Sequence, residues 1–168
     1  MAETTGREAR TDLQGAYDRL APSLFRYALM ILANHHEAED AVQQVFSGLA
    51  GRGTRRIDSL DRYLRVSVRN ECYTMLASRR DLDGRVNGQP LLESVMADTD
   101  RPDDRLALEK ALRALPPEQR EVIHLKVFEG HSFHEIAELT GESINTGASR
   151  YRYAMEKLRA MFGAQRPS

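Results

Sequence analysis

Apolar residues recur three or four positions apart through most of this chain, and nowhere do they alternate with polar residues over the length of a strand. The first such series begins at Leu13 and the last ends at Phe162. A spacing of three or four places side chains on one face of an α-helix, whereas a half-buried strand requires an apolar residue at every second position. The sequence therefore predicts an all-α protein.

The helical spacing is lost between residues 81 and 103. This stretch contains two glycines and two prolines, and residues 81–104 hold seven acids against two arginines, a net charge of −5. Glycine and proline interrupt helices, and a polar stretch without a period is typical of a connection between domains. We predict two small helical domains, residues 12–80 and residues 104–163, joined by an acidic flexible linker at residues 81–103. Pro22 falls inside the first series and predicts a kink or a new helix there.

The second domain ends in a pattern of a short helix, a tight turn and a longer basic helix, over Ser132–Met161. Ser132 with Glu135 three residues later is a capping box that predicts a helix start, and Gly141 predicts its end. Tyr151, Met155, Leu158 and Phe162 then recur at helical spacing. This is the layout of a helix-turn-helix, whose second helix enters the major groove of DNA. For this stretch alone, a surface helical hairpin without that function is an equally good interpretation.

Positive charge is concentrated in two segments. Residues 52–80 hold eight arginines against three acids, a net of +5, and residues 146–166 hold five cations against one acid, a net of +4. Two basic segments on either side of an acidic connector suit a protein that grips a polyanion at two places. The alternative is that the arginines decorate solvated helix faces.

No pattern in the sequence points to catalysis, a cofactor or a metal, so we expect a protein that is not an enzyme. His131 and His134 stand beside Glu135, but no cysteine or further histidine lies at ligand spacing, and surface histidines are the simpler interpretation. The single cysteine, Cys72, lies in a helical apolar stripe, so we expect it to be a core residue. A chain with one cysteine cannot form an internal disulfide, which fits a reducing cytoplasm. The longest apolar run, Tyr27–Ala33, is too short to span a bilayer.

Three segments resemble, in order, blocks of the extracytoplasmic-function sigma factors of bacterial RNA polymerase. They are AEDAVQQVF at Ala38–Phe46, YLRVSVRN at Tyr63–Asn70, and ALRALPPEQREVIHLKVFEGHSFHEIAEL at Ala111–Leu139. The resemblance covers residues 12–162. It implies a first domain that binds core polymerase and the −10 promoter element, and a second domain that binds the −35 element. It also implies that the linker threads the polymerase cleft, and that an anti-sigma protein is a partner.

The resemblance assigns an acidic, amide-rich helix to the clamp-helix coiled coil of the polymerase. Carboxylates and amides pair well with the arginines of an exposed coiled coil. An ordinary solvated helix face is the alternative for these residues. The polymerase-binding residues would be Glu39, Asp40, Gln43, Gln44 and Phe46.

The resemblance also assigns two sets of DNA-binding residues. Cations would follow the phosphates of a melted −10 strand, while aromatic and amide side chains hold unstacked bases. Residues of the second basic helix would contact the −35 duplex and its phosphates. The −10 set is Arg62, Tyr63, Arg65, Arg69, Asn70, Arg79 and Arg80. The −35 set is Thr146, Ser149, Arg150, Arg152 and Tyr153.

The chain departs from the family pattern at the start of the recognition helix. Glu142 and Gly147 stand where the family usually buries apolar side chains, and Ala148 replaces a cation. Ile144 is a candidate to turn inward in their place. Tyr63 stands where the family usually has tryptophan, which leaves open whether it contacts a base or belongs to the core. These departures predict weakened or altered −35 recognition.

The sequence thus predicts a cytoplasmic sigma factor that directs core RNA polymerase to promoter DNA, without a cofactor and without insertion into a membrane. Two alternatives stay open. One is a sigma-like decoy or protein-interaction module held by an anti-sigma partner. The other is a DNA-binding regulator that uses the helix-turn-helix without polymerase.

Overall fold

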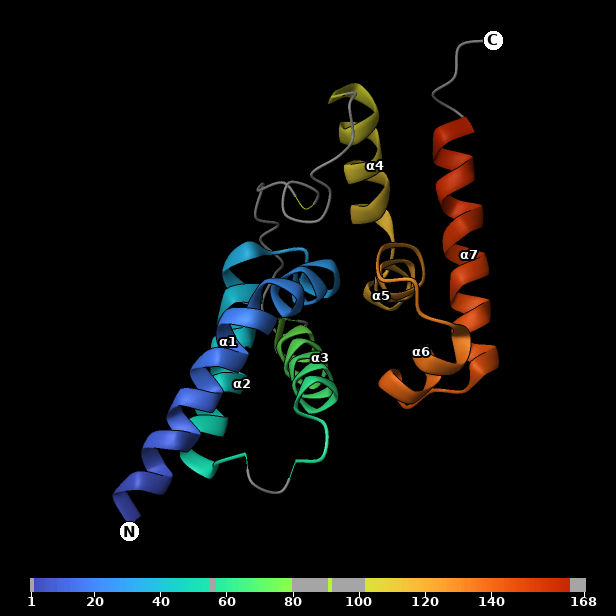
Figure 1. Cartoon of the computed structure of the whole chain (residues 1–168). Helices are drawn as coiled ribbons and strands as arrows, with labels where there is room; N and C mark the ends of the chain where they lie inside the picture. Colours follow the sequence, from blue (N-terminus) through green and yellow to red (C-terminus); the bar gives the residue numbers. More distant parts are fainter. Residues whose placement is uncertain (1, 55–56, 80–90, 92–101, 164–168) are drawn as a thin grey trace. The chain divides into compact units, whose positions relative to one another are not determined.

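The structure, a computed structural model, describes residues 2–54, 57–79, 91 and 102–163, and every regular element among them is a helix (Figure 1). This confirms the all-α prediction. The helices form two compact units, with α1 to α3 in the first and α4 to α7 in the second. None of the helices in the described ranges is long and apolar enough to cross a membrane.

The first unit consists of three helices that pack pairwise: α1 (Ala2–Leu32), α2 (His35–Arg52) and α3 (Leu60–Arg79). Their apolar stripes meet in a core whose innermost side chains are fully buried. These include Leu24, Tyr27, Leu64, Val68 and Cys72. Helix α1 begins before residue 12, the expected start, and it continues through Pro22. Of the two alternatives predicted for that proline, a new helix is therefore excluded, and a kink stays a prediction.

The turn between α1 and α2 follows from a single residue. Ala33 leaves the helix with a φ of 53°, and the side chain of Asn34 then accepts a hydrogen bond of 3.0 Å from the backbone N–H of Glu37. An asparagine in this position satisfies one of the unpaired N–H groups of a helix start. The acidic helix α2 therefore begins directly after this turn. It ends at Gly53, where φ is 78°.

The second unit consists of four α-helices and a π-helical turn. They are α4 (Pro102–Ala114), α5 (Pro117–Ile123), the π-helical η1 (His124–Phe128), α6 (Phe133–Thr140) and α7 (Ile144–Gly163). Helix α7 packs against α4, α5 and α6. Pro117 occupies the first turn of α5, where a proline fits because that position needs no N–H donor. Val127 falls on the wide turn of η1 and is 55% exposed.

The helix-turn-helix pattern is confirmed in its local details. The Ser132 side chain accepts from the N–H of Glu135, whose carboxylate accepts from the N–H of Ser132. Gly141 ends α6 with a φ of 72°, a left-handed conformation that favours glycine. The hydroxyl of Ser143 then accepts from the N–H of Thr146 at 3.0 Å and caps α7. Two local caps therefore define the turn: Ser132 with Glu135 at the start of α6, and Ser143 with Thr146 at the start of α7. Gly141 lies between them.

The apolar stripe of α7 differs from the predicted one. Leu158 is buried as expected, but its buried partners are Ala154 and Gly147, while Phe162 is 36% exposed. Tyr151 stays half-buried, in edge contact with the ring of Phe133 on α6, with 5.6 Å between ring centroids. Small residues on the inner face let α7 approach its neighbours closely, and the larger side chains lie along its sides.

Candidate functional site

Helix α2 carries a continuous polar face on the outside of the first unit. Glu39, Asp40, Gln43 and Gln44 are all exposed, while Ala38, Ala41 and Val42 hold the opposite side against the core. The polar residues are three to four positions apart and therefore lie on one side of the helix. Four of the five predicted polymerase-binding residues thus share one accessible surface, which we call the acidic-amide face.

Phe46, the fifth residue of that set, does not belong to this face. It is 6% exposed and packs edge-on against the ring of Tyr17 of α1, with 4.9 Å between the ring centroids. Such an aromatic pair stabilises the packing of α1 on α2. The prediction that Phe46 contacts a partner directly is corrected: it supports the face from beneath.

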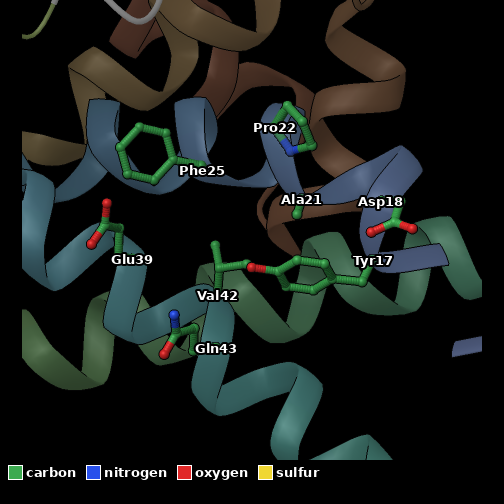
Figure 2. A pocket seen from close by; sticks show the side chains of 8 residues that line it. All are labelled: Tyr17, Asp18, Ala21, Pro22, Phe25, Glu39, Val42 and Gln43. Carbon is green, nitrogen blue, oxygen red and sulfur yellow. The ribbon is translucent and has the colours of Figure 1, made fainter. Parts of the chain in front are cut away.

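A pocket of about 540 Å³ lies between α1 and α2 and borders the acidic-amide face (Figure 2). Tyr17, Ala21, Pro22 and Phe25 line it from α1, and Glu39, Val42 and Gln43 line it from α2, as the sticks in Figure 2 show. Asp18 completes the rim. An apolar floor with two carboxylates at its edge suits a side chain that has an apolar body and a cationic tip. The pocket was not anticipated, because its two walls are more than a dozen residues apart in the chain.

Helix α3 presents a basic and aromatic face. Arg62, Tyr63 and Asn70 are exposed, and Tyr63 and Asn70 are seven residues apart, which places them two turns apart on the same side. Tyr63 is 38% exposed, so it is a surface residue and not part of the core. The side chains needed to hold an unstacked base are therefore accessible on one helix.

Two further arginines of that face lie over aromatic rings. The guanidinium carbon of Arg65 lies 5.8 Å from the ring centroid of Tyr27, and that of Arg69 lies 4.6 Å from the ring centroid of Tyr73. Both arginines are half-buried. A guanidinium stacked on a ring keeps its edge available while its stem is held in place. These contacts hold the two arginines of α3 against aromatic rings of the first unit.

Arg79 is bound within the fold and does not belong to the −10 set as predicted. Its Nε donates to Oε1 of Glu37 at 2.9 Å, its Nη2 contacts Oε2 of the same carboxylate, and its Nη1 donates to the carbonyl oxygen of Leu32 at 3.1 Å. Burial lowers the pKa of Arg79, but a guanidinium stays protonated at physiological pH. The guanidinium is committed to joining three helices, so it is not available to a phosphate. Arg80, its neighbour in the predicted set, lies outside the described residues.

The recognition helix α7 holds the predicted −35 residues in its first three turns. Arg152 and Tyr153 are exposed, with the Arg152 guanidinium 5.1 Å from the ring centroid of Tyr153, and Tyr153 is 50% exposed. Ser149 and Thr146 are half-buried, and the Thr146 hydroxyl lies 2.8 Å from that of Ser143. Thr146 therefore lies in the first turn, where backbone N–H groups favour a phosphate, and Arg150, Arg152 and Tyr153 follow along the same helix.

The unusual residues at the start of α7 have distinct structural roles. Glu142 is exposed, and its Oε1 lies 3.4 Å from Nη2 of Arg150, so it pairs with a predicted DNA contact. Gly147 is buried, and a Cβ added there would lie 3.6 Å from Cγ2 of Ile136 on α6. Ile144 is 49% exposed and has not turned inward. Helix α7 thus lies against Ile136 of α6 through Gly147, at a position where the family usually has an apolar side chain.

The second unit also contains buried polar and ionisable side chains that sequence reasoning missed. They are Glu109, Arg120, Glu121 and His124. Nη1 of Arg120 donates to the carbonyl oxygen of Leu115 at 2.6 Å, which caps the end of α4. The one available signal was that Arg120 and Glu121 interrupt the apolar stripe of their helix.

Glu129 joins two histidines at the start of the helix-turn-helix. Its Oε1 lies 3.0 Å from Nε2 of His124, and its Oε2 lies 3.0 Å from Nε2 of His131. His131 is therefore part of a local network and not a simple surface histidine. Among the described residues, no group of three or more histidine, cysteine or acidic side chains is arranged to hold a metal ion.

Comparisons with known proteins match both units. A family model described as Sigma-70 region 2 matches residues 16–81, and one described as Sigma-70, region 4 matches residues 105–158. The chain is 31% identical over 165 residues to the RNA polymerase sigma factor CarQ of Myxococcus xanthus, which covers 92% of this chain and 91% of that protein. The fold is similar to that of the sigma factor RpoE, solved in complex with the anti-sigma factor NepR from Bartonella quintana. That match has a TM-score of 0.69 and 25% identity, and covers 92% of this chain and 99% of RpoE.

Proposed function

The chain belongs to the extracytoplasmic-function sigma factors of the sigma-70 family, and on that premise we propose that it binds core RNA polymerase and directs transcription initiation at a subset of promoters. The polymerase and promoter DNA are in the bacterial cytoplasm, which is therefore where the protein acts. The function requires no chemistry by the protein itself.

One observation carries the proposal: the first unit exposes an acidic-amide face on α2 and a basic, aromatic face on α3. Glu39 and Asp40 are exposed on the first helix, and Arg62, Tyr63 and Asn70 on the second. A protein partner with arginines complements the first face, and a nucleic acid strand complements the second. Two faces of opposite charge on one small unit suit a protein that holds DNA against a protein machine.

At the −10 element, the proposed role of α3 is to trap bases that leave the stack. Arg62, Arg65 and Arg69 follow the phosphates, Tyr63 stacks on a base, and Asn70 hydrogen-bonds a base edge. Trapping unstacked bases favours the melted state of the promoter, because each captured base lowers the free energy of the open strand. No bond is made or broken in this step.

At the −35 element, α7 enters the major groove. Arg152 and Tyr153 are exposed on this helix, Arg150 is half-buried, and Thr146 with Ser149 lies near its N-terminal end. The Glu142–Arg150 ion pair lowers the positive charge of this surface. We therefore propose that the −35 element contributes less to promoter affinity than the −10 element and the polymerase do.

The solved relative RpoE is bound to an anti-sigma factor, and we extend that class of partner to this chain. Anti-sigma binding would account for regulation of the protein. The residues that such a partner covers would overlap those that contact polymerase.

The test is run-off transcription with core polymerase and candidate promoters. The wild-type protein is expected to initiate transcripts that core polymerase alone does not start. A variant with Asp40→Arg and Gln43→Arg should bind core polymerase at least about tenfold more weakly, since two cations would face arginines. Asp12→Arg, an exposed charge reversal on α1 away from the acidic-amide face, serves as the matched control and should initiate normally.

Two further variants separate the alternatives. A regulator that acts without polymerase would bind duplex DNA alone and would be unaffected by Asp40→Arg. A decoy would bind polymerase or an anti-sigma protein, and replacing Arg150 and Arg152 by alanine would change nothing. Failure of the wild-type protein to bind core polymerase would exclude the proposed function.

A further inference from the structure

Leu91 is fully buried, although it lies in the stretch between α3 and α4. Its side chain is 0% exposed, and its backbone N–H donates to Oε1 of Glu109 on α4 at 2.5 Å. Both residues belong to the second unit. A hydrogen bond therefore holds residue 91 on α4, eleven positions before that helix begins at Pro102, and the side chain of Leu91 is removed from water.

Glu109 accepts this hydrogen bond, and it is unusual for a carboxylate because it is buried. It is 8% exposed, and the same Oε1 that accepts from Leu91 also accepts from Nε of Arg113 at 3.0 Å, one turn further along α4. A carboxylate removed from water is stable only where donors replace the lost hydration. The Leu91 amide is one of those donors, so releasing Leu91 would expose apolar surface and remove a partner from a buried charge.

The contact has a consequence for how far apart the two units can move. A fully extended chain spans about 3.3–3.6 Å per residue, so the chain from Arg79 to Leu91 reaches at most about 40 Å. If Leu91 were free, the tether would run from Arg79 to Pro102 and would reach about 80 Å. Holding Leu91 on α4 therefore halves the maximum length of the connection, whatever path the intervening residues take.

We propose that the contact between Leu91 and Glu109 is a linker anchor, which sets the separation that the two units can reach and hence the promoter spacing that they accept. The inference rests on the proposed function, because it assumes that the units bind two elements of one promoter. Each added base pair lengthens a duplex by about 3.4 Å, so a tether limited by the anchor discriminates between spacings that differ by a few base pairs.

The anchor itself is tested in the free protein by hydrogen exchange at the amide of residue 91. Exchange is expected to be slow in the wild type and at least about tenfold faster in Glu109→Leu, which removes the acceptor. Lys110→Ala, at an exposed position of the same helix, is the matched control and should leave the rate unchanged. Amides of α5 and α7 report whether the unit stays folded. A wild-type amide that exchanges as fast as in Glu109→Leu would overturn the anchor.

The consequence is tested by transcription from promoters whose spacing varies one base pair at a time. A six-residue glycine-serine insertion after Arg85 lengthens the tether before the anchor and should shift the preference towards longer spacings. The same insertion after Met96 lies between the anchor and α4, so it should be silent. In a Leu91→Ser background, which leaves every helix intact, the second insertion should act like the first.

If both insertions shift the preference in the wild-type background, or if neither does, the anchor does not limit the spacing and the inference is overturned. If the wild-type protein supports no initiation at all, the proposed function fails instead. The hydrogen-exchange result still stands or falls by itself, so the two failures are distinguishable.

Discussion

The guanidinium of Arg79, at the end of α3, forms a two-pronged ion pair with the carboxylate of Glu37, forty-two positions earlier at the start of α2. The same guanidinium donates to the carbonyl oxygen of Leu32, the last residue of α1. One side chain thus joins an end of each helix in the first unit. An arginine suits this role because its donors form a rigid fork that matches a carboxylate.

Replacing Arg79 with alanine is therefore expected to lower the free energy of unfolding of the first unit by about 1–2 kcal/mol, since the pair is partly exposed and its charge is partly screened. Arg62→Ala, at an exposed position of the same helix, is expected to change stability by less than about 0.5 kcal/mol and to weaken binding of single-stranded DNA. Chemical denaturation and fluorescence anisotropy measure the two quantities. Equal stability of the two variants would contradict the structural role of Arg79.

Much of the fold could be predicted from the sequence, because its determinants are local. The Ser132–Glu135 capping box, the glycine that ends α6 and Pro117 in the first turn of α5 each involve residues at most a few positions apart. The acidic-amide face was predictable in the same way, since the helical period alone separates Glu39, Asp40 and Gln43 from the buried residues.

What could not be predicted depends on residues far apart in the chain. Arg79 and Arg62 are both arginines of α3, and the sequence around them does not distinguish their roles. Only the proximity of Arg79 to Glu37 in the folded unit gives it a different role. Phe46 belongs to a family motif, yet the position of Tyr17 places it in the core. The contact of Leu91 with Glu109 joins residues eighteen positions apart, one of them in a stretch without any period.

Gly147 and Gly141 are expected to respond in opposite ways to alanine. A Cβ at position 147 would lie at an ordinary contact distance from Ile136, inside a helix, so Gly147→Ala should stabilise the second unit by about 0.5–1 kcal/mol. At position 141 the backbone is left-handed, with a φ of 72°, so Gly141→Ala should destabilise the unit by about 1 kcal/mol. Thermal unfolding of the two variants checks both signs. A loss of stability in Gly147→Ala would show that α6 and α7 lack the space inferred here.

The capping box makes the start of α6 sensitive to acid. The hydrogen bond from the backbone N–H of Ser132 is the largest cause of a lowered pKa of Glu135, followed by the Ser132 side chain, and the nearby His131 adds to it. Because the folded-state pKa lies below the ordinary value of 4.5, the stabilisation is complete above that value and is lost as the pH falls through the folded-state pKa. The wild type should therefore exceed Glu135→Gln in melting temperature at neutral pH, and the difference should shrink on acidification below pH 4.5. A difference independent of pH would contradict this assignment.

Glu142 is expected to weaken DNA binding by α7, because its carboxylate lies 3.4 Å from the Arg150 guanidinium. Glu142→Gln should release that cation and remove a negative charge that faces the phosphates, so affinity for duplex DNA should rise several-fold. The affinity should also depend more strongly on salt concentration. The slope of its logarithm against the logarithm of the salt concentration should steepen by up to about the amount that one further phosphate contact contributes.

Two variants separate this effect from a general change in charge. Glu156→Gln makes the same change of charge at an exposed position further along α7, so it should raise the affinity less. In an Arg150→Ala background Glu142→Gln should lose most of its benefit, because only the long-range charge effect remains. Anisotropy titrations at two or more salt concentrations measure the wild type and the four variants. If Glu142→Gln helps equally with and without Arg150, the ion pair does not restrain the recognition helix and the carboxylate acts through charge alone.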